Sequence, residues 1–136
     1  MEYKEKGLVS HSLAIMQKHD VLNKCILFSG ENDVIAEMQE WFRQNGRPSG
    51  LRLEANFRFL NRDTKAKIQN MDLYEVGLNG GMYANHDVMW LKEHGILTFS
   101  NLMDVPSWWD QLAQSHTAGF KTNCALTVKK YFADMQ

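Results

Sequence analysis

The chain has 136 residues, of which 44% are hydrophobic, and 15 lysines and arginines against 16 aspartates and glutamates leave a net charge of −1. This length predicts one domain, residues 1–136, that can bury a core without disulfides or metal. The balanced charge excludes a global field that would steer the chain to nucleic acid, and the apolar runs are far shorter than the roughly 20 residues that cross a bilayer.

The first third of the chain predicts a helix, a strand and a second helix. Residues 10–23 carry apolar side chains at modest helical spacing after Ser10, which can act as the N-cap. Residues 25–28 are a short apolar run before a Ser-Gly pair, a pattern typical of a buried strand. Residues 32–46 predict an amphipathic helix whose left-handed end falls at Gly46.

Residues 51–60 alternate between apolar and polar side chains. Successive side chains of a strand point to opposite faces, so this pattern predicts a strand with one face on the core and one in water, which is typical of antiparallel sheets. The apolar face is predicted to hold Leu51, Leu53, Ala55, Phe57 and Phe59, and the wet face Arg52, Glu54, Asn56 and Arg58.

The next segment leaves two alternatives open. Asp63 could cap a short helix, or residues 61–64 could turn a hairpin, so residues 61–72 are either helix or strand. Residues 73–78 favour a strand. The glycine-rich stretch 79–81 then supplies the backbone freedom of a tight reversal.

Three further elements are predicted toward the C-terminus. Asn85 caps a helix that Gly95 ends, and residues 96–99 form a strand. Amphipathic helices follow over residues 104–116 and 123–135. Together these elements indicate an α+β fold in two layers, with an antiparallel sheet of about four strands and amphipathic helices packed on one face.

The densest cluster of titratable and aromatic groups lies in the helix at residues 85–94. At the angular spacing of a helix, His86, Trp90 and Glu93 share one face, whereas Val88 and Leu91 point to the core side. A tryptophan gives contact area, and histidine and glutamate give directional polar contacts. The sequence therefore predicts a ligand- or partner-binding site at His86, Trp90 and Glu93.

An enzymatic alternative uses some of the same residues. A small enzyme with hydrolase-like acid/base chemistry could employ His86 with Glu93 or Asp87. Adjacent helical residues point about 100° apart, so His86 and Asp87 are not expected to bond to each other. The histidines form no His-x-x-x-His pair and no nucleotide-binding glycine motif occurs, so no metal and no cofactor are expected.

Because no motif names a reaction, no catalytic residue is assigned and the sequence favours a non-enzymatic binding module. Such a module would recognise a small molecule or a protein and would form a homodimer. Nucleic acid is disfavoured as a partner because Glu54 interrupts the Arg52 and Arg58 patch. With Cys25 and Cys124 far apart and no apolar signal core at the N-terminus, a cytoplasmic location is expected.

Overall fold

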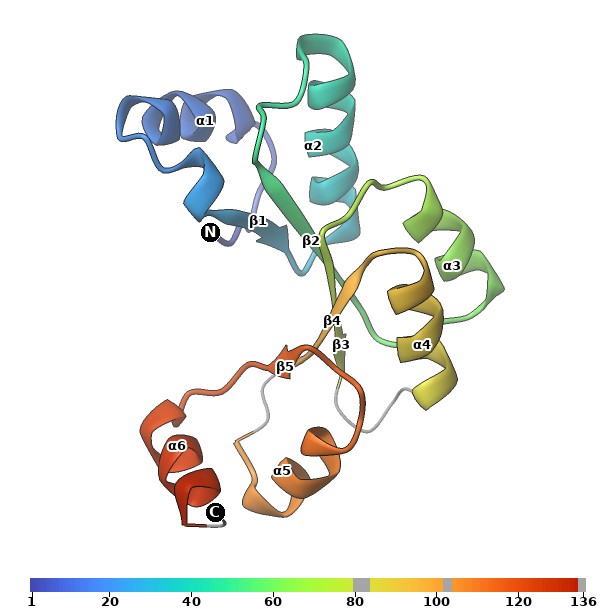
Figure 1. Cartoon of the computed structure of the whole chain (residues 1–136). Helices are drawn as coiled ribbons and strands as arrows, with labels where there is room; N and C mark the ends of the chain where they lie inside the picture. The colour runs from blue at the N-terminus through green and yellow to red at the C-terminus, as the bar shows by residue number, and fades with distance from the viewer. Residues whose placement is uncertain (80–83, 102–103, 135–136) are drawn as a thin grey trace.

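The computed structural model describes residues 1–79, 84–101 and 104–134, and its helices and strands alternate along the chain (Figure 1). The strands are β1 (Ile26–Ser29), β2 (Arg52–Phe57), β3 (Glu75–Asn79), β4 (Leu97–Asn101) and β5 (Gly119–Phe120). The helices are α1 (Val9–Lys18), α2 (Asn32–Asn45), α3 (Arg62–Gln69), α4 (Asn85–Glu93), α5 (Pro106–Ala113) and α6 (Ala125–Ala133), with a short 3-10 helix, η1 (Leu22–Lys24).

The described strands form a five-stranded sheet in which every pairing is parallel and the spatial order follows the chain order. The predicted antiparallel α+β fold with about four strands is therefore wrong, and the class is α/β. A helix follows each strand. The helices between consecutive strands carry the chain back to the end of the sheet where the strands begin, as parallel pairing requires. Sequential parallel order with intervening helices is the connectivity of a (β/α) barrel.

The segment 61–72 explains why β2 and β3 pair in parallel. Its backbone forms α3, and Asn61 caps the helix because its side chain accepts a hydrogen bond from the Thr64 amide at 2.9 Å while Thr64 Oγ1 accepts from the Asn61 amide at 2.7 Å. This capping box starts a helix. A hairpin turn would have paired β2 and β3 antiparallel, whereas the helix carries the chain back and makes them parallel.

The two faces of the sheet differ in character. On the face that packs against the helices, β2 contributes Leu53, Ala55 and Phe57, all at most 5% exposed. On the opposite face of the same strand Glu54 is 2% exposed, so the polar side predicted to lie in water is covered there. Phe59 lies beyond the end of β2 and is 49% exposed. Alternation alone could not reveal that the polar face is enclosed.

The apolar core has two parts among the described residues. The larger cluster joins α1, α2 and α4 to the sheet, and a smaller one surrounds Trp109 and Leu112 of α5, with side chains of α6 packed against them. Within the parts of the chain that the structure describes, no helix combines the length and apolar character that a membrane crossing requires.

The helix ends confirm two of the sequence predictions and contradict two others. Gly46 and Gly95 end α2 and α4 with positive φ angles of 83° and 72°, which confirms both. The N-caps predicted at Asn85 and Asn123 are wrong, because α4 and α6 begin after Ala84 and Cys124. Two other predictions fall outside the described residues. The reversal predicted over 79–81 lies partly outside them, and residue 135, the last apolar position of the C-terminal helix, lies wholly outside them.

Candidate functional site

The candidate site lies on the sheet face that the helices leave uncovered. In register across neighbouring strands, Glu54 pairs with Glu75, and two residues later Asn56 pairs with Gly77. Because side chains alternate along a strand, these two rows share one face. They lead toward the carboxyl ends of the strands, where sites of parallel α/β sheets are found.

A buried charged cluster occupies the first row. Glu54 and Glu75 are 2% and 4% exposed, and Lys121, which directly follows β5, forms an ion pair with Glu54. The Lys121 ammonium also lies 4.9 Å from the centre of the Phe28 ring. Two buried acids are thus joined by a lysine whose side chain is 33% exposed, and buried charges of this kind need partners to be tolerated.

This arrangement changes the acidity of Glu75. Burial, followed by the hydrogen bond and the charge of Glu54, raises the pKa of Glu75 to about 7, although Lys121 and Arg52 act in the opposite direction. Two neighbouring carboxyl groups cannot both ionise easily in a dry environment. The Glu54–Glu75 pair therefore holds a proton that exchanges near neutral pH, which is the property that acid/base catalysis requires.

An amide pair crosses the sheet in the second row. Asn101 Nδ2 donates to Asn56 Oδ1 at 2.8 Å, although β3 runs between the two strands that carry them. Gly77 of β3 lies between the two side chains, and a Cβ atom there would collide with Asn56 Oδ1. Glycine at this position is what lets the two amides meet.

A cavity of about 540 Å³ opens at this end of the sheet. Its walls include two cations, two amides, a carboxylate and an aromatic ring, from Arg58, Lys121, Asn56, Asn101, Glu2 and Phe28. Glu2 reaches it because the N-terminal residues run parallel to β1, with the Tyr3 amide donating to the Phe28 carbonyl at 2.8 Å. Such a polar cavity suits an anionic ligand that also carries hydroxyl groups.

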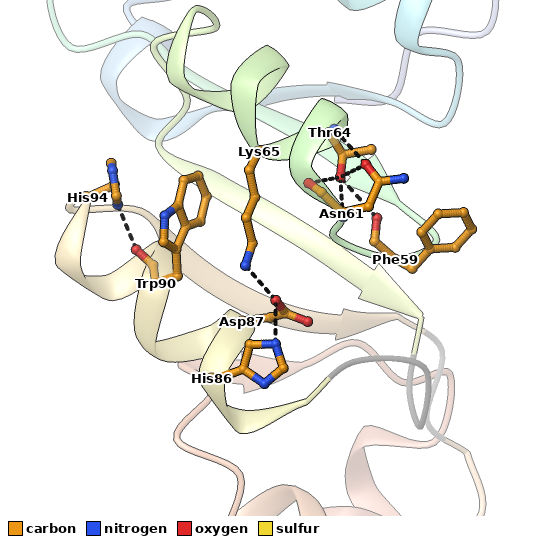
Figure 2. A network of polar contacts seen from close by, with 8 residues as sticks. All are labelled: Phe59, Asn61, Thr64, Lys65, His86, Asp87, Trp90 and His94. Carbon is orange, nitrogen blue, oxygen red and sulfur yellow. Dashed lines mark hydrogen bonds and ion pairs between the residues drawn. The ribbon is translucent and has the colours of Figure 1, made fainter.

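The residues predicted as a site from the sequence lie on α4, and Figure 2 shows part of their surroundings. His86 and Asp87 do meet: His86 Nε2 lies 3.3 Å from Asp87 Oδ1, which also pairs with Lys65 Nζ at 2.8 Å. Within the described part of the chain Asp87 Oδ1 takes part in no hydrogen bond, so the expectation that the His86 and Asp87 side chains would not hydrogen-bond to each other is not contradicted. The Asp87 side chain is 8% exposed and that of His86 76%, so the carboxylate links α3 to α4 while the imidazole faces solvent.

Trp90 and Glu93 are placed differently from His86. Trp90 is half-buried against the main core, with the His94 ring 4.2 Å and the Lys65 ammonium 5.2 Å from its ring centre. Glu93 is exposed at the last position of the helix. At about 1.5 Å per residue, seven residues separate His86 from Glu93 by roughly 10 Å. The assignment of His86, Trp90 and Glu93 to a binding site stays a prediction.

Trp90→Ala tests that assignment. If Trp90 serves a binding surface, the free energy of unfolding should fall by no more than about 1 kcal/mol, whereas truncation of a packed aromatic residue costs about 3–5 kcal/mol. Urea titration gives the stability and a thermal-shift ligand screen on the same sample gives the binding. A large stability loss with unchanged ligand binding would make Trp90 a core residue.

Metal-independent folding is a second prediction. Among the residues that the structure describes, no group of three or more histidine, cysteine, aspartate or glutamate side chains is arranged to hold a metal ion. Excess EDTA should leave the melting temperature of the protein unchanged, because a metal bound only to the folded state would stabilise it. A fall of several degrees in a thermal melt would refute the prediction, and re-addition of divalent cations would identify the metal.

Sequence reasoning missed Glu54, Glu75 and Lys121. Glu54 was placed on a solvated strand face, and the other two carried no motif. Glu54 and Glu75 are paired on the adjacent strands β2 and β3, and Lys121 directly follows β5, which is separated from β3 by β4. This arrangement becomes visible only when the sheet is known to be parallel.

Comparisons with known proteins agree with the topology. No family model matches the sequence, and no curated protein matches it significantly. The fold does match solved structures. A protein from Silicibacter pomeroyi DSS-3 assigned as a glycerophosphoryl diester phosphodiesterase superposes with a TM-score of 0.76 at 12% identity, over 94% of this chain and 44% of that one. One from Galdieria sulphuraria assigned as a glycerophosphodiester phosphodiesterase gives 0.79 at 12% identity, over 96% and 52%.

These neighbours correct the functional interpretation of the sequence. Both carry enzyme names, which contradicts the non-enzymatic binding module with its protein partner and favours the hydrolase alternative. Nothing in the described part of the chain supports the expected homodimer. The prediction that residues 1–136 form one domain stays a prediction, since the chain spans about half the length of each neighbour. What the comparison establishes is the fold: this chain has the parallel α/β architecture of about half of these solved chains.

Proposed function

We propose that the sheet face that carries Glu54 and Glu75 is part of a hydrolase site for a phosphodiester, with acid/base chemistry from the Glu54–Glu75 pair. The observation that carries this proposal is the pKa of about 7 of Glu75 beside the Glu54–Lys121 ion pair. The names of the fold neighbours, which refer to diesters of glycerophosphate, support the same substrate class.

The cavity supplies groups that suit a phosphodiester. Arg58 and Lys121 can face the negative charge of the phosphoryl oxygens, and the Asn56–Asn101 pair offers donors and acceptors to hydroxyl groups. Lys121 connects the two parts of the site, because it lines the cavity and contacts Glu54. Positioned cations are the main means by which proteins stabilise the charge that develops during phosphoryl transfer.

Hydrolysis requires that the leaving alcohol oxygen gain one proton and that the attacking water lose one. Water adds to phosphorus as the bond from phosphorus to the alcohol oxygen breaks. The Glu54–Glu75 pair is joined to the cavity through Lys121 and does not itself line it. The pair supplies the proton that the departing alcohol oxygen takes up, and it receives the proton that the attacking water gives up, which restores the starting state. A carboxyl group with a pKa near 7 can perform both steps at neutral pH.

The experiment is a substrate screen with the purified chain. Glycerophosphodiesters and a chromogenic phosphodiester should be hydrolysed, and the corresponding phosphomonoesters should react more slowly because their extra charge and missing alcohol group fit the site less well. Released alcohol and phosphate products are quantified over time. Absence of diester hydrolysis by the folded chain would refute the proposal.

We also propose a cytoplasmic location. Cys25 and Cys124 are both free thiols. Free thiols persist in reducing compartments. Fractionation of cells that express the chain with a small tag would test the location.

A further inference from the structure

The loop after β4 and the loop after β5 are joined by one carboxylate. Asp104 Oδ1 accepts hydrogen bonds from the Thr122 hydroxyl at 2.7 Å and from the Asn123 amide at 2.8 Å. Asp104 Oδ2 accepts from Asn123 Nδ2 at 2.8 Å. Asp104 was predicted to lie in the helix that became α5, but that helix begins at Pro106, and the carboxylate serves the neighbouring loop instead.

The residues that Asp104 binds follow Lys121 directly in the chain. The Lys121 backbone is also bonded to β4, because its amide donates a hydrogen bond to the Ser100 carbonyl at 2.8 Å. The strand before it, β5, has only two residues, so the sheet alone gives this part of the backbone few hydrogen bonds. Lys121 is therefore held between the end of β4 and the Asp104 clamp, which we define as Asp104 with Thr122 and Asn123.

We propose that Asp104 is a positioning residue: through the Asp104 clamp it holds the Lys121 ammonium against Glu54 and beside the cavity. The inference rests on the proposed function, because it assigns Asp104 a role in the same site. Asp104 itself would not touch substrate. Its effect would pass through the backbone to Lys121 and from there to the carboxyl pair.

The charge of Asp104 supports this role. An aspartate is ionised at neutral pH, and the hydrogen bonds from Thr122 and Asn123 lower the pKa of Asp104 further below its ordinary value. Ionised acceptors form stronger hydrogen bonds than neutral ones. The clamp is therefore intact in the pH range in which the site would operate.

The test uses the pKa of Glu75, followed by carbon NMR of the carboxyl group in the absence of substrate. Lys121 lowers that pKa in the native protein. Asp104→Ala should release Lys121 and raise the pKa of Glu75 by about one pH unit, and Lys121→Met should raise it as much. The double variant should show no further rise, because both changes remove the same interaction.

Asp110→Ala is the matched control. Asp110 is also bonded to the C-terminal region, since the Tyr131 hydroxyl donates to its two oxygens at 3.1 and 3.0 Å, but these contacts lie on α5 and α6 and not at Lys121. This variant should leave the pKa of Glu75 unchanged. An equal shift in Asp110→Ala would overturn the proposal, because it would show general loosening of the region.

A folded Asp104→Ala variant with the native Glu75 pKa would also overturn the proposal. If that variant does not fold, Thr122→Val removes one donor of the clamp and should still shift the pKa in the same direction, so an unshifted value there has the same meaning. Turnover of a phosphodiester by Asp104→Ala should fall by up to about 100-fold. If the native chain hydrolyses no diester, the proposed function fails, while the pKa measurements still decide whether Asp104 positions Lys121.

Discussion

Glu75→Gln should lower kcat for phosphodiester hydrolysis by about 100- to 10,000-fold, the range that a general acid or base contributes. Glutamine keeps the size and polarity of the side chain but cannot transfer the proton that Glu75 holds at a pKa of about 7. If the proposed function holds, the native protein should lose activity as the pH rises through about 7, since Glu75 is then ionised and cannot supply a proton to the leaving oxygen. Initial rates between pH 5 and 9 would measure both effects.

The stability of Glu75→Gln separates a catalytic effect from misfolding. In the folded protein the pKa of Glu75 rises from 4.5 to about 7, so between these values the native state binds more protons than the unfolded state. Native stability should therefore fall as the pH rises from 4.5 to 7 and then level off. Glu75→Gln should lack this fall. Glu5→Gln, at an exposed glutamate, is the control. Native turnover in a folded Glu75→Gln variant would contradict the role assigned to Glu75.

Trp109→Ala should lower the free energy of unfolding by about 3–5 kcal/mol, the usual cost of truncating a buried aromatic residue. The Trp109 side chain is 1% exposed and is central to the cluster between α5 and α6, with its ring 5.0 Å from that of Tyr131 in an edge-to-face arrangement. Chemical denaturation followed by circular dichroism would give the value.

The adjacent residue provides the matched control. Trp108 is 38% exposed, so Trp108→Ala should change stability by no more than about 1 kcal/mol. A loss below about 1 kcal/mol for Trp109→Ala would mean that this cluster contributes little to the fold. Phe132, which lies on the apolar side of the predicted C-terminal helix, is only half-buried and should have a smaller effect than Trp109.

Most local elements could be predicted from the sequence, because the signals that define them are local. The spacing of Val34, Ile35, Met38 and Phe42 indicated α2, and these four side chains are buried. The core side of α4 was also predicted correctly at Val88 and Leu91, which are 1% and 0% exposed. A helical period or a helix-ending glycine depends on a few neighbouring residues, so it can be recognised without the rest of the fold.

The orientation of the strands could not be predicted in the same way. The alternation in β2 indicated a strand correctly but was interpreted as a wet antiparallel face. Whether that face meets water depends on Lys121 and Glu75, which come from other parts of the chain and enclose Glu54. The parallel pairing of β2 and β3 followed from α3, for which the sequence left helix and strand open.

The sequence by itself thus indicated four of the five described strands, most helices and the core-facing sides of α2 and α4, because periodicity and helix-ending signals act over a few residues, whereas β5 was not predicted. Only the tertiary structure decided the sheet order and the candidate site. Glu54, Glu75 and Lys121 are separated by up to 67 residues in the chain, and their ion pair and raised pKa exist only after parallel strands bring them together in a place from which water is excluded. Long-range burial, unlike helical spacing, has no local sequence pattern.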